Sequence, residues 1–502
     1  MPFIRRKSAR FFFWAVAALF AVGFSAYAAR AGLTGWAVRS ALRAAGAVDV
    51  RLAVRDASPG RVVIEDLRLR IRQIPLEARQ VSIVRERWWA PTLGRVDVAG
   101  ARATVDVVDL AAATARLAGE DHAAEERARP PVEIPLEAVT IDGRLVVKAE
   151  GLEQVLQVSV AARLDPADRH WEGRAEVDGP GIAVRADAVY RPDAQELSFR
   201  VPTARLDLHP WQEFAQRVIP AAAQDWRLEG RVEATAEGRV SPARSTTSGT
   251  LKVQDGALTS ATQPDGISGL NADLEFADLA GLATAPAQRL HIAEARFANL
   301  TGRDLDVRFQ LKGADLVEVS SLTVNTLGGT IAVEPFQFVP SANEFAATLR
   351  AEQLSVEELL KLAPDVPAKA SGRVDGCVPL SVNRDGVRFG AGWIGLSPGA
   401  TAEVRFNAQG LLTSGMRPGR PDYAIMSKIE GGILQLRLAE LRFDIHPPDA
   451  PAERSARLHL AGTPVDPAVK APVTLDINVN GPVERLLDFG LSSRVSLGEP
   501  KP

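Results

Sequence analysis

Apolar and polar residues alternate with a period of two along most of the chain after residue 46. In the segment 67–72, for example, three apolar side chains interleave with three arginines. The apolar positions of the clearest such segments are Leu67, Leu69 and Ile71; Leu305, Val307, Phe309 and Leu311; Leu434, Leu436 and Leu438; and Leu475, Ile477 and Val479. A period of two puts alternate side chains on opposite faces of a β-strand. Because one face is apolar and the other polar, the pattern predicts antiparallel strands with one face toward solvent.

Two local features refine this prediction. The alternation shifts by one position at Ala439-Glu440 before Leu441 and Phe443 resume it, which predicts a β-bulge. A Gly-Arg pair precedes many of the alternating segments, and glycine tolerates the positive φ of tight hairpins, so we expect each such glycine at a turn. These glycines are Gly60, Gly94, Gly143, Gly173, Gly230, Gly238 and Gly372. Their irregular spacing favours a succession of hairpins over a fixed-period solenoid.

Helical patterns are few and short. Asp109–Ala118 has an aspartate cap and alanine-rich periodicity, and Trp211–Val218 follows Pro210. Ser355 and Glu358 have the spacing of a capping box, which predicts a helix through Leu362. The charged, proline-bearing stretch 119–135 shows no periodicity and is typical of a linker.

The N-terminal residues have the pattern of a membrane anchor. Arg5, Arg6, Lys7 and Arg10 precede an uncharged run from Phe11 to Ala29. As a helix this run would span about 28 Å, close to the thickness of a bilayer core. The basic cluster would stay in the cytoplasm and the rest of the chain would lie on the far side. A cleavable signal peptide is the alternative, since the segment 26–28 (Ala-Tyr-Ala) offers a cleavage site.

A second helical pattern follows the apolar run. From Gly32 to Ala45 the apolar and small residues recur at spacings of three and four, with Arg39 and Arg43 on an adjacent face. This amphipathic helix is expected to lie on the membrane surface where the chain leaves the bilayer.

The predicted fold class is mostly β. An N-terminal transmembrane helix is followed by an elongated, curled antiparallel β-sheet, an open groove with a few short helices. A sheet of about thirty strands exceeds the usual limit for a flat open sheet, so the strands must curl or divide into modules. The predicted regions are an anchor at 1–30, an amphipathic helix at 31–46, an N-terminal β region at 47–118, a linker at 119–135, a central β-groove at 136–340, a C-terminal β region at 341–492 and a tail at 493–502.

Composition narrows the function classes. Apolar residues make up 46% and charged residues 24% of the 502 residues, which is ordinary for a folded chain. The net charge of −3 gives no basic excess for phosphate binding, so nucleic acid is not an expected partner. Cys377, the one cysteine, excludes an intramolecular disulfide and cysteine-based metal clusters.

Motifs for catalysis are nearly absent from the sequence. The six histidines are scattered singly, without metal-ligand spacing. The one G-x-S-x-G match, Gly395–Gly399, precedes an alternating segment, whereas a nucleophile elbow needs a helix at that point. We therefore interpret it as a Ser-Pro-Gly turn, predict no catalytic or metal-binding residue and no cofactor, and expect a protein that is not an enzyme.

The segment Leu354–Gly399 resembles the C-terminal region of YdbH-type proteins. The shared pattern is a short helix, a strand of the form G-x-V-x-G-x-V-P-L, a glycine-led strand and a closing Pro-Gly turn. The matching residues are Gly372, Gly376, Pro379, Leu380, Gly386, Pro398 and Gly399. The similarity extends over roughly residues 200–490, and the anchor-plus-strands layout is that of the wider AsmA-like superfamily.

This resemblance implies a single-pass inner-membrane protein of a Gram-negative bacterium, with most of the chain in the periplasm. It implies phospholipid as the cargo, carried between the inner and outer membranes along an apolar groove, and a protein partner in the outer membrane or periplasm at the C-terminal end. The thirteen alternating apolar residues named first are the candidates for the lipid-binding surface.

Two other function classes stay open at this stage. A periplasmic scaffold or assembly factor for outer-membrane proteins would use strand edges rather than the apolar face. A small-molecule (dicarboxylate) binder or transporter would need a compact arginine-lined pocket, and arginine is dispersed along this sequence.

Overall fold

The computed structural model of the chain describes residues 30–480, except 33, 41, 44–46, 59, 72–73, 86–93, 107–135, 150, 219–224, 243, 263–264, 298, 343, 363–367, 384–385, 407–412, 414–415, 447–453 and 468–470. The chain divides into two compact units. Unit 1 comprises Met1–Gln224 and Glu233–Thr247, and unit 2 comprises Asp225–Val232 and Ser248–Pro502. The described residues are mostly β-strand, with a few short helices, as predicted.

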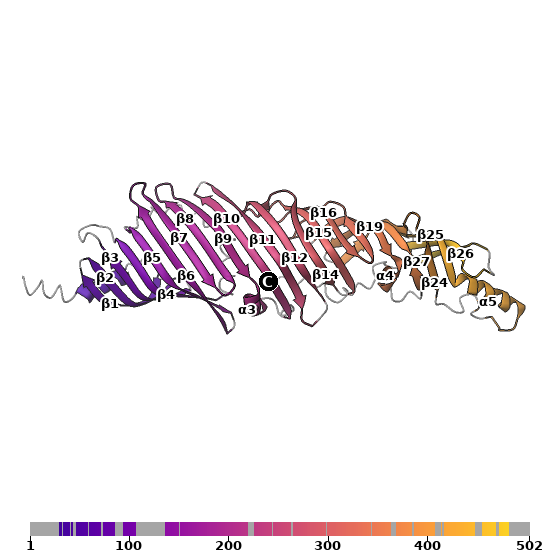
Figure 1. Ribbon diagram of the computed structural model, residues 1–502, viewed down its shortest axis with the longest axis horizontal. Helices are drawn as coiled ribbons and strands as arrows, with labels where there is room; N and C mark the ends of the chain where they lie inside the picture. Colours follow the sequence, from indigo (N-terminus) through magenta and orange to yellow (C-terminus); the bar gives the residue numbers. More distant parts are fainter. Residues whose placement is uncertain are drawn as a thin grey trace, which may run out of the picture. The chain divides into compact units, whose positions relative to one another are not determined.

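In unit 1 each strand pairs with the next one along the chain (Figure 1). The strands are β1 (Ala47–Ser58), β2 (Arg61–Ile71), β3 (Ile74–Val84), β4 (Arg95–Asp106), β5 (Ala138–Ala149), β6 (Leu152–Asp165), β7 (His170–Gly179), β8 (Ile182–Arg191) and β9 (Glu196–Asp207). Two further strands, β10 (Trp226–Val240) and β11 (Ser245–Ser260), contribute residues to both units.

One pair in unit 1 corrects the prediction of a purely antiparallel sheet. Strands β4 and β5 are parallel, with Val96 opposite Val139 and Val105 opposite Val147. Parallel neighbours need a crossover of a dozen or more residues, and residues 107–137 between the two strands supply that length. The alternation of side chains is the same in both kinds of pair, so the sequence pattern does not distinguish them.

The paired strands of unit 2 are antiparallel throughout its described residues. They are β12 (Gly266–Asp278), β13 (Ala283–Thr284), β14 (Gln288–Phe297), β15 (Leu300–Leu311), β16 (Val317–Thr326), β17 (Gly329–Val333), β18 (Phe336–Phe338), β19 (Phe345–Ser355), β20 (Ala368–Ser371), β21 (Arg373–Asn383), β22 (Gly386–Phe389), β23 (Gly392–Leu396), β24 (Ala402–Phe406), β25 (Gln435–Ile445), β26 (Arg454–Pro464) and β27 (Val473–Asn480). The predicted bulge is confirmed, because the register of β25 against β26 shifts between Leu438 and Glu440.

The helices only partly match the prediction. The 3-10 turn η2 (His209–Trp211) and helix α3 (Gln212–Val218) confirm the helical segment after Pro210, and α4 (Val356–Lys361) confirms the helix after Ser355. Ser355 is the N-cap by backbone geometry, yet its side chain makes no capping hydrogen bond. Helix α5 (Pro421–Ile433) was not predicted, although Pro421 in its first turn and Asp422 beside it are start signals.

Several glycines predicted at turns lie inside strands instead. Gly60, Gly94 and Gly372 precede β2, β4 and β21 as expected, but Gly143 and Gly173 are interior to β5 and β7, and Gly230 and Gly238 are interior to β10. A Cβ at Gly143 would lie 2.5 Å from the carbonyl oxygen of Ala101 on the neighbouring strand, so glycine there permits close strand approach. The expectation was wrong at these positions. At Gly143 and Gly238 the reason is close packing, because a Cβ at Gly238 would lie 2.8 Å from Phe199, whereas a Cβ at Gly173 would meet no atom closer than 3.8 Å.

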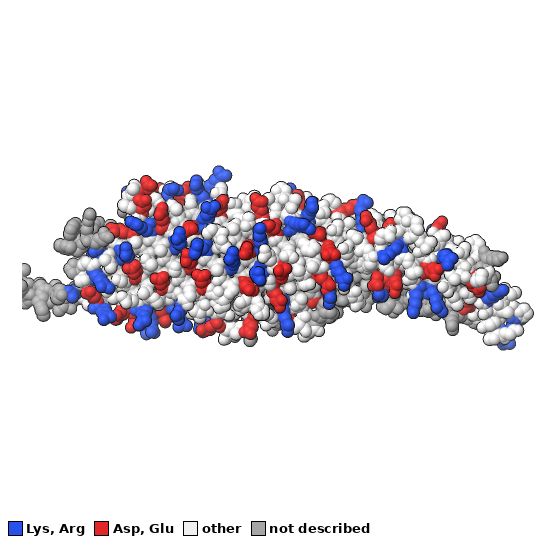
Figure 2. All heavy atoms as spheres, in the orientation of Figure 1, with Lys and Arg blue, Asp and Glu red and all other residues white. Residues whose placement is uncertain are grey.

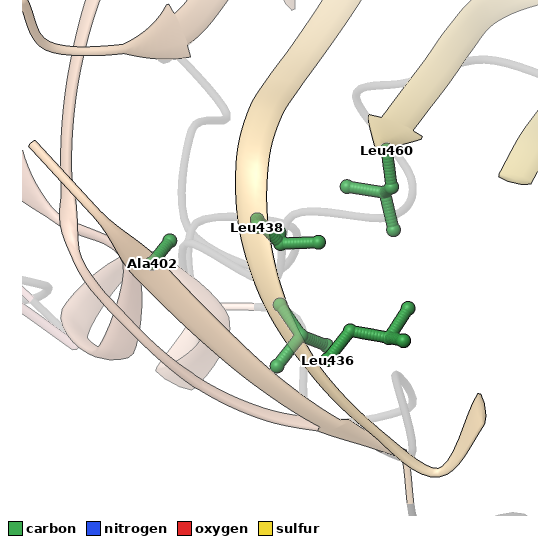
Figure 3. Close-up of a cluster of buried hydrophobic side chains, with 5 residues drawn as sticks. Ala402, Leu436, Leu438 and Leu460 are labelled. Atoms are coloured by element: carbon green, nitrogen blue, oxygen red, sulfur yellow. The ribbon is translucent and has the colours of Figure 1, made fainter. Parts of the chain in front are cut away.

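The buried apolar clusters lie toward the two ends of the described chain. In unit 1 they join β1–β4 to the helical residues 34–40 and 42–43, and in unit 2 the largest joins β24, β25 and β26 (Figure 3). Leu436, Leu438 and Leu460 there are at most 2% exposed. Among the described residues no clustered side chain comes from positions 99–326.

No helix among the described residues is both long and apolar enough to cross a bilayer. The predicted anchor run 11–29, the predicted helix at 109–118, the linker at 119–135 and the tail at 493–502 lie outside the described residues.

Candidate functional site

Strands β5 to β9 of unit 1 leave one apolar face incompletely covered. Along β6, Leu156, Val158 and Val160 alternate with exposed polar or small residues, and of these three only Leu156 is fully buried. The same alternation continues on β7 and β8, where the inward side chains are mostly half-buried. We call this the inner face of unit 1. A sheet face with no second layer over it remains available to another apolar molecule.

The strand register gathers small side chains at the centre of this inner face. Ala162 of β6 is opposite Gly173 of β7, which is opposite Ala188 of β8. In the next row Ala175 is opposite Ala186. All five residues are half-buried, and a Cβ at Gly173 would meet no other atom closer than 3.8 Å. We call these five residues the small-residue lane.

Bulky side chains border the lane along both directions of the strands. One row continues from Leu164 through Trp171 and Tyr190 to Leu197, with Tyr190 39% exposed. On the other side Val158, Val177 and Val184 follow one another in the row next to Ala175 and Ala186. The two rows are six residues apart on β6, or about 20 Å. The inner face therefore offers a shallow apolar surface with raised borders.

The inner face of unit 2 is similarly accessible, but the row that crosses β12, β14, β15 and β16 is made mostly of larger apolar residues. Ala272, Leu290, Val307 and Leu322 follow one another across β12, β14, β15 and β16. The leucines and the valine of this row are half-buried, so this face is also not sealed by a second layer.

The structure divides the thirteen predicted surface residues into distinct environments. Leu436 and Leu438 are buried in the cluster of Figure 3, and Leu69 is buried against the helical residues near β1. Leu434 is the C-cap of α5 rather than a strand residue, which corrects the predicted start of that strand. Half-buried positions are Leu67, Leu305, Val307, Phe309, Leu311, Leu434 and Leu475, while Ile71 and Ile477 are exposed. The side chain of Val479 lies outside the described residues.

The opposite face of the strands is charged, with arginines paired to acids across strands (Figure 2). Arg174 donates to Asp187 at 2.9 Å, and Arg289 donates two hydrogen bonds to Asp306. The Arg289 hydrogen bonds, with a smaller effect of the nearby His291, hold the pKa of the Asp306 carboxyl below its usual value. The pKa of Asp476 is lowered in the same way by hydrogen bonds from His459 and Arg457. This face therefore stays solvated while the inner face stays apolar.

A cavity of about 610 Å³ on strands β4 to β9 brings together arginines that are far apart in the sequence. Its lining includes Ala162, Gly173 and Ala188 of the small-residue lane. Arg95, Arg163, Arg174 and Arg200 also belong to the lining, although the alternation places their side chains on the charged face. Sequence reasoning missed this grouping because it depends on register. Arg174 is paired with Asp187, and Arg200 lies 3.7 Å from Glu237.

The side chains that could serve in catalysis or metal binding make contacts within their own turns and with neighbouring strands. Ser397 is 2% exposed and donates a hydrogen bond of 2.6 Å to Asp375, and the amide of Ala400 donates to its carbonyl, which confirms the turn. Three potential metal ligands, Asp165, Asp168 and His170, come together at the β6–β7 turn. There Asp165 accepts from the amide of Ala167, and His170 lies 3.3 Å from a carboxylate oxygen of Glu172.

Comparison with protein families gives one match. A model of the YdbH-like family, described as intermembrane phospholipid transport protein YdbH, matches residues 93–395. The chain belongs to the YdbH-like family. The match confirms the resemblance, but it begins earlier than the predicted region of roughly 200–490 and ends at residue 395. It includes the whole small-residue lane. Comparisons with curated proteins and with solved structures gave no match.

Proposed function

We propose that this protein moves phospholipids between the inner and outer membranes by holding their acyl chains against its inner faces. The observation that supports this best is the half-buried apolar face of β5–β9, which lies in the matched region of a family described by intermembrane phospholipid transport. Each CH₂ group removed from water contributes about 0.8 kcal/mol, so a lipid outside a bilayer needs extended apolar cover. Half-buried side chains supply that cover without a closed pocket.

In unit 1 the acyl chains would bind on the small-residue lane. Alanine and glycine leave room above the backbone, and the bulky rows on either side restrict sideways movement. The lipid headgroup would point away from the sheet into water. The half-buried members of the predicted set, such as Leu305 and Val307, would serve in the same way in unit 2.

The proposal includes an anchor in the inner membrane and a periplasmic location for the strands. Support comes from the uncharged run 11–29 behind four basic residues, which has the length and flanks of a membrane span. A lipid gradient or a protein partner would set the direction of transport. By supplying phospholipid to the outer membrane, the protein would contribute to outer-membrane lipid homeostasis.

The decisive experiment uses two adjacent residues of β6. Ala162 faces inward in the lane, whereas Ala161 is exposed on the charged face opposite Arg174. A benzophenone amino acid placed at position 162 of the full chain in cells should form phospholipid adducts on illumination, detected by mass spectrometry. The same group at position 161 should not. Equal adduct formation at both positions, or none at 162, would reject the proposal.

A matched pair of substitutions tests whether the lane binds lipid, by measuring the phospholipid bound to each purified variant. Ala162→Asp should lower the phospholipid bound to the purified protein by about tenfold or more, because an unpaired carboxylate against acyl chains costs over ~1.4 kcal/mol. Ala161→Asp is the control, with the same change one residue away on the solvated face. If both variants keep their lipid, the lane is not the binding surface.

A second candidate function has support from the arginine-lined cavity. Four arginines contribute to the lining of the cavity of about 610 Å³ beside the small-residue lane, and their guanidinium groups would suit a small anionic molecule, as the dicarboxylate hypothesis requires. Acidic partners near Arg174 and Arg200 reduce the positive charge there. Calorimetric titration of the full chain with succinate, and of the Arg163→Gln variant, distinguishes this function: binding that the variant loses would support it.

A further inference from the structure

The helical residues before β1 have two different faces. Residues 30–32, 34–40 and 42–43 are helical, and we call them the N-terminal helix. Val38 packs against the cluster around Ile64, and Leu42 packs against the cluster around Ala47. Gly35 is buried, and a Cβ there would lie 3.3 Å from Val54. The spacing of these three residues defines the face that lies on the sheet of unit 1.

The opposite face of this helix is exposed and contains an aromatic residue. Trp36 is 67% exposed, the highest value among the large apolar side chains of the described residues. Ala37 and Ser40 beside it are also exposed, as is Arg43. A solitary exposed leucine would need no explanation, but tryptophan on a small-residue helix face next to arginine is the combination that membrane interfaces favour.

The occupant of this face follows from the chain that precedes it. The uncharged run 11–29 ends immediately before residue 30, so a bilayer that holds this run lies within a few residues of the helix. Tryptophan prefers the headgroup level of a bilayer, and arginine is attracted to anionic headgroups. A protein that covered this helix face instead would have to fit between the helix and the nearby bilayer.

We propose that the exposed face of the N-terminal helix lies in the headgroup region of the bilayer, with Trp36 inserted. Because Gly35, Val38 and Leu42 fasten the other face to β1–β3, the helix fixes the first strands of unit 1 at the membrane surface. Unit 1 is then held in a set orientation to the membrane rather than swinging on a tether. This inference rests on the proposed membrane anchoring. It adds which surface of the protein contacts the bilayer and how deeply that surface is inserted.

Spin-label depth measurements on the full chain test the inference. In a Cys377→Ser background, a nitroxide is attached at Ser40→Cys on the exposed helix face, and separately at Ser159→Cys on the charged face of β6. The chain is reconstituted in vesicles of phosphatidylethanolamine and phosphatidylglycerol. The label at 40 should be more accessible to oxygen than to a water-soluble nickel complex, and the label at 159 should show the reverse. Nickel accessibility at 40 equal to that at 159 would overturn the inference.

A second variant separates insertion from mere proximity. Trp36→Asp, combined with Ser40→Cys, should shift the label at 40 to water-like accessibility, while the circular dichroism spectrum stays unchanged because Trp36 is outside the buried clusters. No shift would contradict a role for Trp36. Loss of both accessibilities together with dipolar broadening would indicate a second copy on this face and would also contradict the inference.

The lipid-adduct experiment at position 162, carried out in cells, keeps the two proposals apart. Adducts at 162 with a water-exposed label at 40 would reject the interfacial helix alone. Absence of adducts with an inserted label would reject the lane and leave the helix inference standing.

Discussion

Leucines of equal size have different environments in unit 2 according to what covers them. Leu436 is 0% exposed in the cluster of β24–β26, and Leu305 on β15 is half-buried on the inner face. Both were candidates for the lipid-binding surface from the same alternating pattern. Comparing the two leucines therefore distinguishes apolar positions that stabilise the fold from those that remain accessible.

Replacing each leucine by alanine should separate the two roles. Leu436→Ala should destabilise the protein by about 2–5 kcal/mol, because it removes buried methylenes and leaves a cavity. Leu305→Ala should cost less than about 1.5 kcal/mol, since part of that side chain already contacts water. Denaturant unfolding of the full chain, followed by circular dichroism, measures both. A larger loss for Leu305→Ala would contradict the assignment.

The charged face predicts an acid dependence of stability. Arg289 lowers the pKa of Asp306 in the folded state, so this pair contributes stability above the unfolded value of about 3.8–3.9. That contribution is lost as the pH falls through the folded-state pKa. The melting temperature should therefore drop below about pH 4, and it should drop less steeply in Asp306→Asn. Parallel pH profiles for the two proteins would contradict this prediction.

At the scale of elements, helix α4 shows a cap formed by the backbone alone. Ser355 has the extended conformation of an N-cap, and its amide donates to the carbonyl of Leu327, while its hydroxyl makes no capping bond. Val356 is buried beside Leu354 and Val374, and this packing holds the start of the helix.

Substitution at this cap should therefore have little effect. Ser355→Ala should change the free energy of unfolding by less than about 0.5 kcal/mol, whereas a working serine cap is worth about 1 kcal/mol. Val356→Ala is the positive control, because it removes a side chain that is 8% exposed. Thermal unfolding of the two variants compares them, and a loss near 1 kcal/mol for Ser355→Ala would show that the hydroxyl does cap the helix.

At the scale of the whole molecule, charge and apolar surface are separated onto opposite faces within each unit. The cross-strand ion pairs are exposed, for example with 65% and 43% of the side chains of Arg174 and Asp187 accessible. Exposed pairs contribute about 0–1 kcal/mol each and are screened by salt. Lipid held on the inner faces, as we propose, would depend on apolar contact instead.

Salt and detergent should therefore affect the bound lipid differently. Washing the purified full chain in high salt should leave the phospholipid that crosslinks at position 162 in place, since apolar burial is not screened. A mild detergent above its micelle concentration should displace it. Lipid extraction from the washed protein, followed by mass spectrometry, measures how much phospholipid remains bound after each treatment. Release by salt alone would point to headgroup recognition on the charged face.

The local pattern determined the strands, their single apolar face and the bulge at Leu438–Glu440, because alternation and a shift in it are properties of neighbouring residues. It also located α4 by the capping-box spacing of Ser355 and Glu358, although the Ser355 side chain makes no capping hydrogen bond. It missed α5, whose glycines weaken the helical pattern. The family resemblance, from turn and strand motifs, was confirmed over residues 93–395.

Only the tertiary structure decided which apolar positions stay accessible. Leu436 and Leu305 look alike in sequence, and what differs is the second set of side chains that covers one of them. The parallel pairing of β4 with β5, the gathering of Ala162, Gly173 and Ala188, and the meeting of four arginines likewise depend on register between distant segments. Such long-range contacts leave no local trace, because each strand carries only its own alternation.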